Sequence, residues 1–258
     1  MADETPIPVQ TKDKRSSTHK GYHWVYYAPL DKLVCFDYRK GRGRDGPEEF
    51  LESFRGMLQS DGYNAYDIYE KKSGITLFGC MAHACRKFEN TKDNDLERAE
   101  YVLERMQKLY MTEREAREKD PSFDERKELR IKQSLPILQE LEKWMKEQLP
   151  DVLPKSSIGQ AITYTLGLWN RLTRYIENGQ VEIDNNLIEN SIKPVAIGRK
   201  NYLFAGSHEE AQQAEMIYSF LDTCKINNVE PLGWLKDVLQ KIQDHSIQKL
   251  DELLSTKI

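Results

Sequence analysis

The spacing of apolar residues changes once along this chain, near residue 82, and this change constrains the fold most. Before it, aromatic and β-branched segments separated by turn residues predict strands at 6–10, 22–28, 33–38, 57–60 and 75–79. After it, apolar residues recur every three or four positions, which predicts long helices over 99–110, 135–149 and 158–176 and two closing helices after 211. Such stripes are core-forming, so we assign them no cofactor role. The pattern indicates an α+β or mixed α/β fold, in which hairpin-linked strands lead into βαβ units.

Composition excludes several classes of protein. No apolar run approaches the roughly 20 residues that cross a bilayer, and the N-terminus lacks the basic start and apolar centre of a signal peptide. Four cysteines without a framework spacing fit a reducing compartment. We therefore expect a soluble cytoplasmic protein with no membrane partner.

Net charge argues mildly against nucleic-acid binding by the molecule as a whole, because it is −4. Local charge matters more than the sum. The stretch between Thr11 and Arg44 contains nine Lys and Arg and three Asp, and the stretch between Asn190 and Ser207 contains three cations and no acid. A locally basic surface is therefore compatible with the sequence.

The segment Ile183–Ser207 places one carboxylate, Glu189, in an Asn/Asp cluster directly before Lys193, Arg199 and Lys200. An acid that can hold a metal beside cations that can hold phosphate suggests chemistry on a nucleic-acid backbone. Taken singly, Glu189 is equally an ion-pair partner for Lys193 four residues on.

Two further acids fall at strand ends, Asp3 at the start of the first strand and Asp61 at the end of the fourth. Carboxylates at such places can converge on the open edge of a mixed sheet. Three of them can hold two Mg²⁺ or Mn²⁺ ions for a phosphodiester displacement. Each also has a simpler interpretation, since Asp61-Gly62 is a common turn pair and Asp3 alone is a solvated residue. The residues by themselves support no more than a nuclease-like hypothesis.

Five motifs in one order, spanning almost the whole chain, extend this hypothesis. The sequence resembles the insertion-sequence-66 family of DDE transposases, enzymes of bacterial mobile elements. The motifs are Asp3-Glu4-Thr5 before a YHWVY strand, Leu58 to Tyr63 (LQSDGY), Gly79 to Phe88 (GCMAHACRKF), Asp184 to Glu189 (DNNLIE) and Gly198 to Ser207 (GRKNYLFAGS).

The resemblance implies a ribonuclease-H-like mixed sheet with a large all-helical insertion between the second and third acids, followed by C-terminal helices. It implies Asp3, Asp61 and Glu189 as the catalytic, metal-binding triad with two Mg²⁺ or Mn²⁺ ions. We expect three segments: 1–88 with the strands and first two acids, 89–180 as the helical insertion, and 181–258 with the third acid, the basic segment and the closing helices. The candidate DNA contacts are Lys193, Arg199, Lys200, Arg86 and Lys87, with His83 and Asn186 as supporting residues.

The implied function is metal-dependent DNA strand cleavage and strand transfer. Water attacks the phosphodiester at the transposon end, and the freed 3′-hydroxyl then attacks target DNA. Implied partners are transposon ends, target DNA, further copies of the chain and accessory proteins of the same element, in a cytoplasmic, nucleoid-associated setting. The alternative is a catalytically silent DNA- or protein-binding remnant, because family members carry an N-terminal DNA-binding and zinc-binding region that we expect to be missing here.

Two other motifs suggest different ligands. Cys80-x-x-His83 with Cys85, which stands where relatives usually have arginine, is compatible with zinc, although a structural site needs four ligands. A packed or hydrogen-bonded Cys/His group is the simpler interpretation. Gly41-x-Gly43-x-x-Gly46 has the spacing of a dinucleotide fingerprint, but Pro47 follows its third glycine. We favour a basic loop there over a nicotinamide site.

Overall fold

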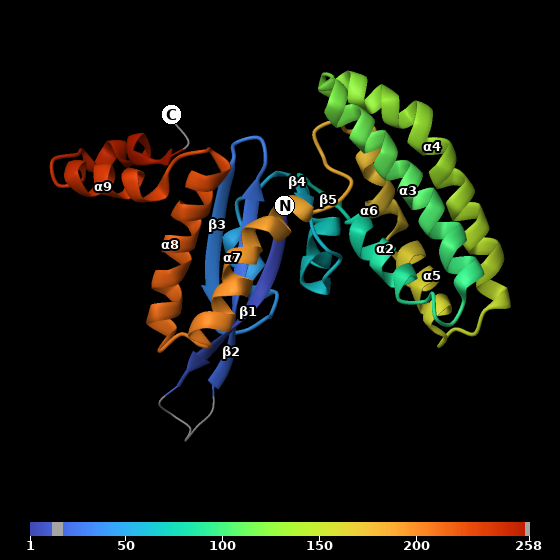
Figure 1. Ribbon diagram of the computed structural model, residues 1–258, viewed down its shortest axis with the longest axis horizontal. Helices are drawn as coiled ribbons and strands as arrows, with labels where there is room; N and C mark the ends of the chain where they lie inside the picture. The colour runs from blue at the N-terminus through green and yellow to red at the C-terminus, as the bar shows by residue number, and fades with distance from the viewer. Residues whose placement is uncertain (12–17, 256–258) are drawn as a thin grey trace. The chain divides into compact units, whose positions relative to one another are not determined.

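The computed structural model describes residues 1–11 and 18–255, so Lys12, Lys14 and Arg15 of the basic N-terminal stretch lie outside the described residues. Contacts group the chain into two compact units, Met1–Phe54 with Asn186–Ile258, and Arg55–Asn185. These boundaries differ from the three expected segments, because residues 55–88 share a hydrophobic core with the helices that follow them. The mixed α+β composition is confirmed (Figure 1).

The first unit is built on a three-stranded antiparallel sheet of order β1-β2-β3. The hairpin predicted between the second and third strands is present, with Lys32 at positive φ in the turn. The remaining elements of this unit are helical. The bounds are β1 Ala2–Gln10, β2 Thr18–Ala28, β3 Leu33–Arg39, α1 Asp45–Phe50, α7 Asn186–Tyr202, α8 His208–Ile226, α9 Pro231–Lys241 and the 3₁₀ segment η4 Ile247–Leu253.

Helices α7 and α8 lie beside the sheet (Figure 1). They pack on it through apolar side chains. Val25 and Phe36, cross-strand partners of β2 and β3, share a core with Ile188 and Val195 of α7. Ile7 and Val9 of β1 pack with Ala211 of α8. Because successive side chains on a strand point to opposite faces, these contacts identify one helix-covered face of the sheet.

The outer edge of β3 is covered by polar side chains of α8. The backbone N–H of Phe36 donates to Ser219 Oγ at 2.8 Å, that of Val34 to Thr223 Oγ1 at 3.2 Å, and that of Tyr38 to Glu215. Four helical residues rise about 6 Å and two strand residues about 6.6 Å, so side chains every fourth position meet alternate N–H groups. The edge strand is thereby protected from pairing with another chain.

The second unit combines a two-stranded parallel sheet with a helical bundle. Strands β4 and β5 pair in parallel from Gly56↔Ile75 to Gln59↔Phe78. The long helices α3 and α4 form a hairpin beside the shorter helices (Figure 1). The bounds are β4 Gly56–Gln59, η1 Asn64–Lys71, β5 Ile75–Phe78, α2 Met81–Glu89, α3 Leu96–Lys119, α4 Phe123–Gln148, η2 Leu149–Asp151, α5 Ser157–Gly167, α6 Trp169–Thr173 and η3 Arg174–Glu177.

One apolar core holds the second unit together. Phe78, Met81 and Phe88 from the β5–α2 region are buried with Met106 and Leu109 of α3 and with apolar residues of α4 to α6. The helical stripes predicted from the sequence are thus core, as expected. Among the described residues, the helices nowhere join the length and the apolar character that crossing a bilayer requires.

The mixed sheet implied by the resemblance is not confirmed. Within residues 1–11 and 18–255 the strands form two sheets, one antiparallel and one parallel. Residues 64–71 form the 3₁₀ helix η1, and the basic segment from Lys193 to Lys200 lies in helix α7. The ribonuclease-H-like arrangement implied by the resemblance therefore stays a prediction.

Candidate functional site

Asp3 lies in β1 opposite Val25 of β2. Directly paired residues of an antiparallel sheet share a face, so the Asp3 side chain is on the face that α7 covers. Its Oδ1 accepts a hydrogen bond from the Glu4 backbone N–H at 2.7 Å. The neighbouring Glu4 carboxylate points to the opposite face and pairs with Arg42 at 2.7 Å.

Glu189 lies in the first turn of α7, half-buried beside the core residue Ile188. A carboxylate is favoured there because the helix macrodipole places partial positive charge at the N-terminus. Asp3 and Glu189 thus belong to two packed elements of the same unit, β1 and α7. Lys193 does not need Glu189 as its partner, since its Nζ donates to Asn190 Oδ1 at 2.5 Å.

Asp61 follows β4 in the second unit, at a tight turn. Its Oδ1 accepts from the Tyr63 backbone N–H at 2.8 Å, an Asx turn. Gly62 adopts φ +89°, and a Cβ on it would lie 2.8 Å from Leu168 Cδ1. Glycine is therefore required by both backbone conformation and space. The Tyr164 hydroxyl donates to the Asp61 carbonyl at 3.1 Å.

The donor set has the chemistry of a hard-cation site, because all three acids are carboxylates. Among the described residues, no group of three or more His, Cys, Asp and Glu side chains lies close enough to hold a metal. Asp3 and Glu189 lie in the first unit and Asp61 lies in the second, so the three-acid site stays a prediction.

Arg199 and Lys200 occupy the last turn of α7. Lys200 is exposed, whereas the half-buried Arg199 donates to the Pro6 carbonyl of β1. Burial, and then the positive charge of Arg199, lowers the pKa of His23 on β2 to about 4. Arg199 therefore joins α7 to β1, and its predicted phosphate contact stays a prediction.

After α7, the chain follows the free edge of β1. Ala205 N–H donates to the Pro8 carbonyl at 2.8 Å, and Gln10 N–H donates to the Ala205 carbonyl at 2.8 Å. Leu203 takes a positive φ of 59° just before this pairing. The motif that follows Gly198 thus links the end of the third-acid helix to the strand that carries Asp3.

Helix α2 presents Arg86 and Lys87 on its exposed last turn. Lys87 Nζ lies 5.1 Å from the centre of the Tyr164 ring, a cation–π contact. His83, a predicted supporting residue, is half-buried on the same helix, and Asn186 is the exposed first residue of α7.

The cysteines of the Cys80–Cys85 motif are packed groups. Cys80 Sγ accepts from the Asn185 backbone N–H at 3.4 Å, and Cys85 Sγ contacts Met106 Sδ at 3.2 Å. Burial raises the pKa of each thiol to about 12, so both are protonated at neutral pH.

The glycine motif at 41–46 does not have the surroundings of a dinucleotide site. It joins β3, which is antiparallel to β2, to the six-residue helix α1, whereas the fingerprint requires a parallel βαβ unit. Arginines of this basic stretch already have acidic partners: Arg39 contacts Asp37 at 2.7 Å, and Arg42 contacts Glu4.

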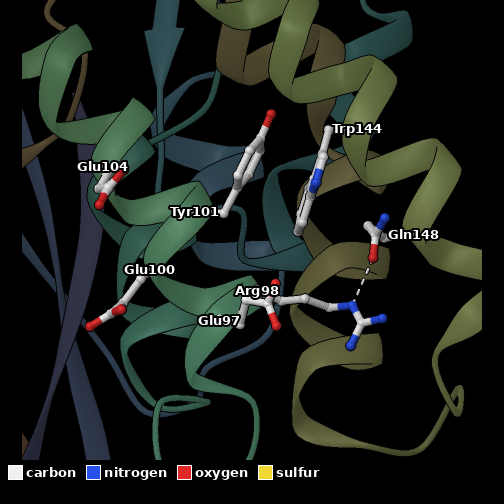
Figure 2. A pocket seen from close by; sticks show the side chains of 7 residues that line it. All are labelled: Glu97, Arg98, Glu100, Tyr101, Glu104, Trp144 and Gln148. Carbon is white, nitrogen blue, oxygen red and sulfur yellow. Dashed lines mark hydrogen bonds between the residues drawn. The ribbon is translucent and has the colours of Figure 1, made fainter.

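A hollow of about 390 Å³ lies on the α3–α4 hairpin (Figure 2). Its lining includes Glu97, Glu100 and Glu104 together with the stacked rings of Tyr101 and Trp144, whose centroids are 4.3 Å apart. None of the predicted site residues lines it. Carboxylates repel phosphate, so this face of the hairpin does not suit the DNA backbone.

Comparison with known proteins decides the family. The family described as "Transposase IS66 family" matches residues 1–213, and the "IS66 C-terminal element" matches residues 219–255. The chain belongs to the IS66 transposase family. The match covers all three candidate acids, the predicted DNA contacts and the helical insertion.

Three relatives from Sinorhizobium fredii (strain NBRC 101917 / NGR234) are uncharacterized proteins. The protein y4qI is 36% identical over 258 residues, covering 94% of this chain and 47% of its own length. The proteins y4hP and y4jD are 31% and 32% identical, with 98% of this chain matched to 49% and 52% of theirs. The chain thus spans about half the length of these relatives. No solved structure matches.

Two residues near the IS66 motifs were missed by sequence reasoning. Gln59, buried at the end of β4, donates to the carbonyls of Gly79 at 3.0 Å and Glu182 at 2.8 Å. Tyr164 contacts the Asp61 backbone, and burial, followed by the Asp61 charge, raises its pKa to about 12. For Gln59 the available signal was a polar residue at the end of an otherwise apolar strand. Tyr164 lies outside the apolar stripe of its helix and gave none.

Proposed function

We propose that this chain is the catalytic region of a transposase that cleaves DNA strands and joins them to target DNA with divalent metal ions. Family membership over residues 1–213 carries the proposal. The triad is Asp3, Asp61 and Glu189, and the fold is ribonuclease-H-like. Since the relatives are about twice as long, DNA-end recognition and assembly into an oligomer are proposed for the whole protein.

The three carboxylates would hold Mg²⁺ or Mn²⁺, which supplies activation of the attacking oxygen and charge stabilisation of the leaving one. The chain's own contribution is positioning. The Asx turn orients Asp61 through its bond to Tyr63 N–H, and α7 carries Glu189 in its first turn, where an acidic residue complements the helix dipole. Lys193 and Lys200, exposed on α7, would contact phosphates of the bound strand.

Strand cleavage of a supercoiled plasmid bearing the element's ends tests this function. With Mg²⁺ or Mn²⁺, the wild-type chain should nick the plasmid, whereas Asp61→Ala and Glu189→Ala should abolish nicking and leave DNA affinity largely intact. Glu97→Ala is a matched control, because it removes an exposed acid of α3 that is outside the triad. It should nick like the wild type.

Two outcomes would contradict the proposal in different ways. Nicking that persists in either triad variant would show that the acids are wrongly assigned. Folded wild-type protein that binds the ends without nicking them would instead support the alternative of a catalytically silent binding protein.

A further inference from the structure

A neutral cluster of four charged side chains lies inside the second unit, where the helical insertion meets the segment Asn178–Asn185. Its members are Glu113 of α3, Arg126 and Arg130 of α4, and Glu182 of the segment. The side chains of Glu113 and Arg130 are 0% exposed, and that of Arg126 is 11% exposed. Arginines hold the pKa of Glu113 below its usual range despite its burial, so the acid is ionised.

Arg130 uses its guanidinium to join α3 to the backbone of the segment. It binds both carboxylate oxygens of Glu113 at 2.7 Å. It also donates to three carbonyls: Tyr175 at 3.0 Å, Asn178 at 2.6 Å and Val181 at 2.9 Å. An irregular segment must satisfy its carbonyl groups, and here one side chain satisfies two of them, those of Asn178 and Val181, together with the Tyr175 carbonyl of η3.

Arg126 holds the same segment through a side chain. Its two terminal nitrogens bind the two oxygens of Glu182 at 2.9 and 2.8 Å, a bidentate pair, and one of them also donates to the Gly179 carbonyl at 3.2 Å. A Cβ on Gly179 would lie 1.9 Å from the Phe123 carbonyl oxygen, so the start of α4 sits directly against the segment.

The other side of the segment contacts the residues around the second acid. Gln59, two residues before Asp61, donates to the Glu182 carbonyl at 2.8 Å. The Met81 N–H at the start of α2 donates to the Ile183 carbonyl at 3.1 Å. Glu182 is therefore held from two directions, by its carboxylate to the insertion and by its carbonyl to the end of β4.

The position of this segment in the chain gives the cluster a consequence beyond stability. Directly after it, at Asn186, α7 begins and carries Glu189 in its first turn. Buried ion pairs are often no more stabilising than apolar residues of the same volume, so stability alone is a weak reason for four charges. Their directional bonds, however, fix a segment geometrically.

We propose that the helical insertion acts as a clamp, in which Arg126 and Arg130 hold Glu182 and its segment against the end of β4. The clamp fixes the place from which the chain enters the third-acid helix relative to the second acid. Arg126, Arg130, Gln59 and Glu182 are then positioning residues for cleavage. This inference rests on the proposed function for its catalytic consequence, and on the contacts above for the clamp itself.

Glu182→Gln tests the clamp, because it removes the bidentate ion pair and keeps the backbone carbonyl that Gln59 binds. Glu140→Gln is the matched control: Glu140 also joins α3 to α4, through Arg105 and Tyr101 at 2.9 Å, but it does not contact the segment. Hydrogen exchange on the full chain should show amides of 178–185 exchanging about tenfold faster in Glu182→Gln, and unchanged in Glu140→Gln.

Plasmid nicking at saturating DNA provides the functional measurement. Glu182→Gln should lower the cleavage rate by about tenfold or more and raise the Mn²⁺ concentration for half-maximal rate, because misplaced ligands bind metal less well. DNA affinity should be unchanged. Arg126→Lys retains the charge but loses the bidentate geometry, so it should change the cleavage rate and the Mn²⁺ requirement in the same direction but less. This variant replaces Glu182→Gln in the experiment if Glu182→Gln does not fold.

The outcomes separate this inference from the proposed function. Equal hydrogen exchange in Glu182→Gln and Glu140→Gln would overturn the clamp, whatever the nicking result. Faster exchange with an unchanged nicking rate would overturn its positioning role. A wild-type chain that does not nick would reject the proposed function and the catalytic role of the clamp, while hydrogen exchange would still decide whether the clamp exists.

Discussion

Glu215 of α8 makes the stability of the fold depend on pH. Its carboxylate accepts the Tyr38 backbone N–H at the edge of β3. Burial raises its pKa to about 7, and the Tyr38 hydrogen bond opposes this shift only in part. Between about pH 4.5 and 7 the folded chain therefore holds a proton that the unfolded chain has lost. Linkage then requires stability to fall as pH rises through this window.

Glu215→Gln should remove this part of the pH dependence, because the amide keeps an acceptor oxygen and does not titrate. Since the carboxylate is only half-buried, we expect an effect of about 1 kcal/mol or less, which narrows the difference in Tm between pH 5 and pH 8 by about 2–4 °C. Thermal unfolding at both values measures it, with the exposed Glu104→Gln as control. An equal difference in Tm for wild type and Glu215→Gln would contradict the assignment.

At the scale of the element, α8 replaces a neighbouring strand with side chains spaced four residues apart. Thr223 both accepts from Val34 N–H and donates to the Val34 carbonyl, at 3.2 and 3.3 Å.

Thr223→Val keeps the shape of the side chain but leaves both backbone groups of Val34 without their partner. It should cost about 1–3 kcal/mol in the free energy of unfolding. Chemical denaturation checks this, and the exposed Gln213→Ala on the same helix should change it little. A loss no larger than that of Gln213→Ala would show that the ladder does not stabilise the edge.

Elements were predictable from the sequence where one local pattern sufficed. The hairpin before Leu33 and the stripes of α3, α4 and α5 follow from turn residues and apolar spacing. The division of the strands into two sheets could not be predicted in this way, because contacts between residues distant in sequence decide which strands pair. Helix α7 contains Pro194 and Gly198, both unfavourable in a helix, yet Ile188 and Val195 pack it on the sheet.

The candidate site was predictable to a similar extent. Motifs marked the acids and the cations, but not their partners. From the sequence we predict Arg199 to be a phosphate contact, whereas in the structure it donates to the Pro6 carbonyl. The same group can serve both uses, since guanidinium N–H groups donate to carbonyl oxygens as well as to phosphate oxygens. Only the folded neighbourhood distinguishes the two.

Charge over the whole molecule favours a local DNA contact rather than a general one. The net charge of the chain is −4. On the α3–α4 hairpin, three glutamates line the hollow shown in Figure 2. Arginines of the described N-terminal stretch, Arg39 and Arg42, are paired with carboxylates. Lys193 and Lys200 are exposed on α7 in a segment that contains no acid after Glu189. We therefore expect them to dominate the electrostatic part of binding.

The salt dependence of DNA affinity tests this distribution. Each phosphate contact contributes about 0.9 to the slope of log K against log salt concentration, so Lys193→Gln with Lys200→Gln should flatten the slope by up to about 2. Lys143→Gln is the control: its side chain is 79% exposed on α4, in the other unit. Its slope should equal that of the wild type, because this lysine lies beside Glu147 on α4, outside the basic segment of α7. Equal slopes for the double variant and the wild type would place the phosphate contacts elsewhere, and Arg86→Gln with Lys87→Gln on α2 would then be the pair to measure.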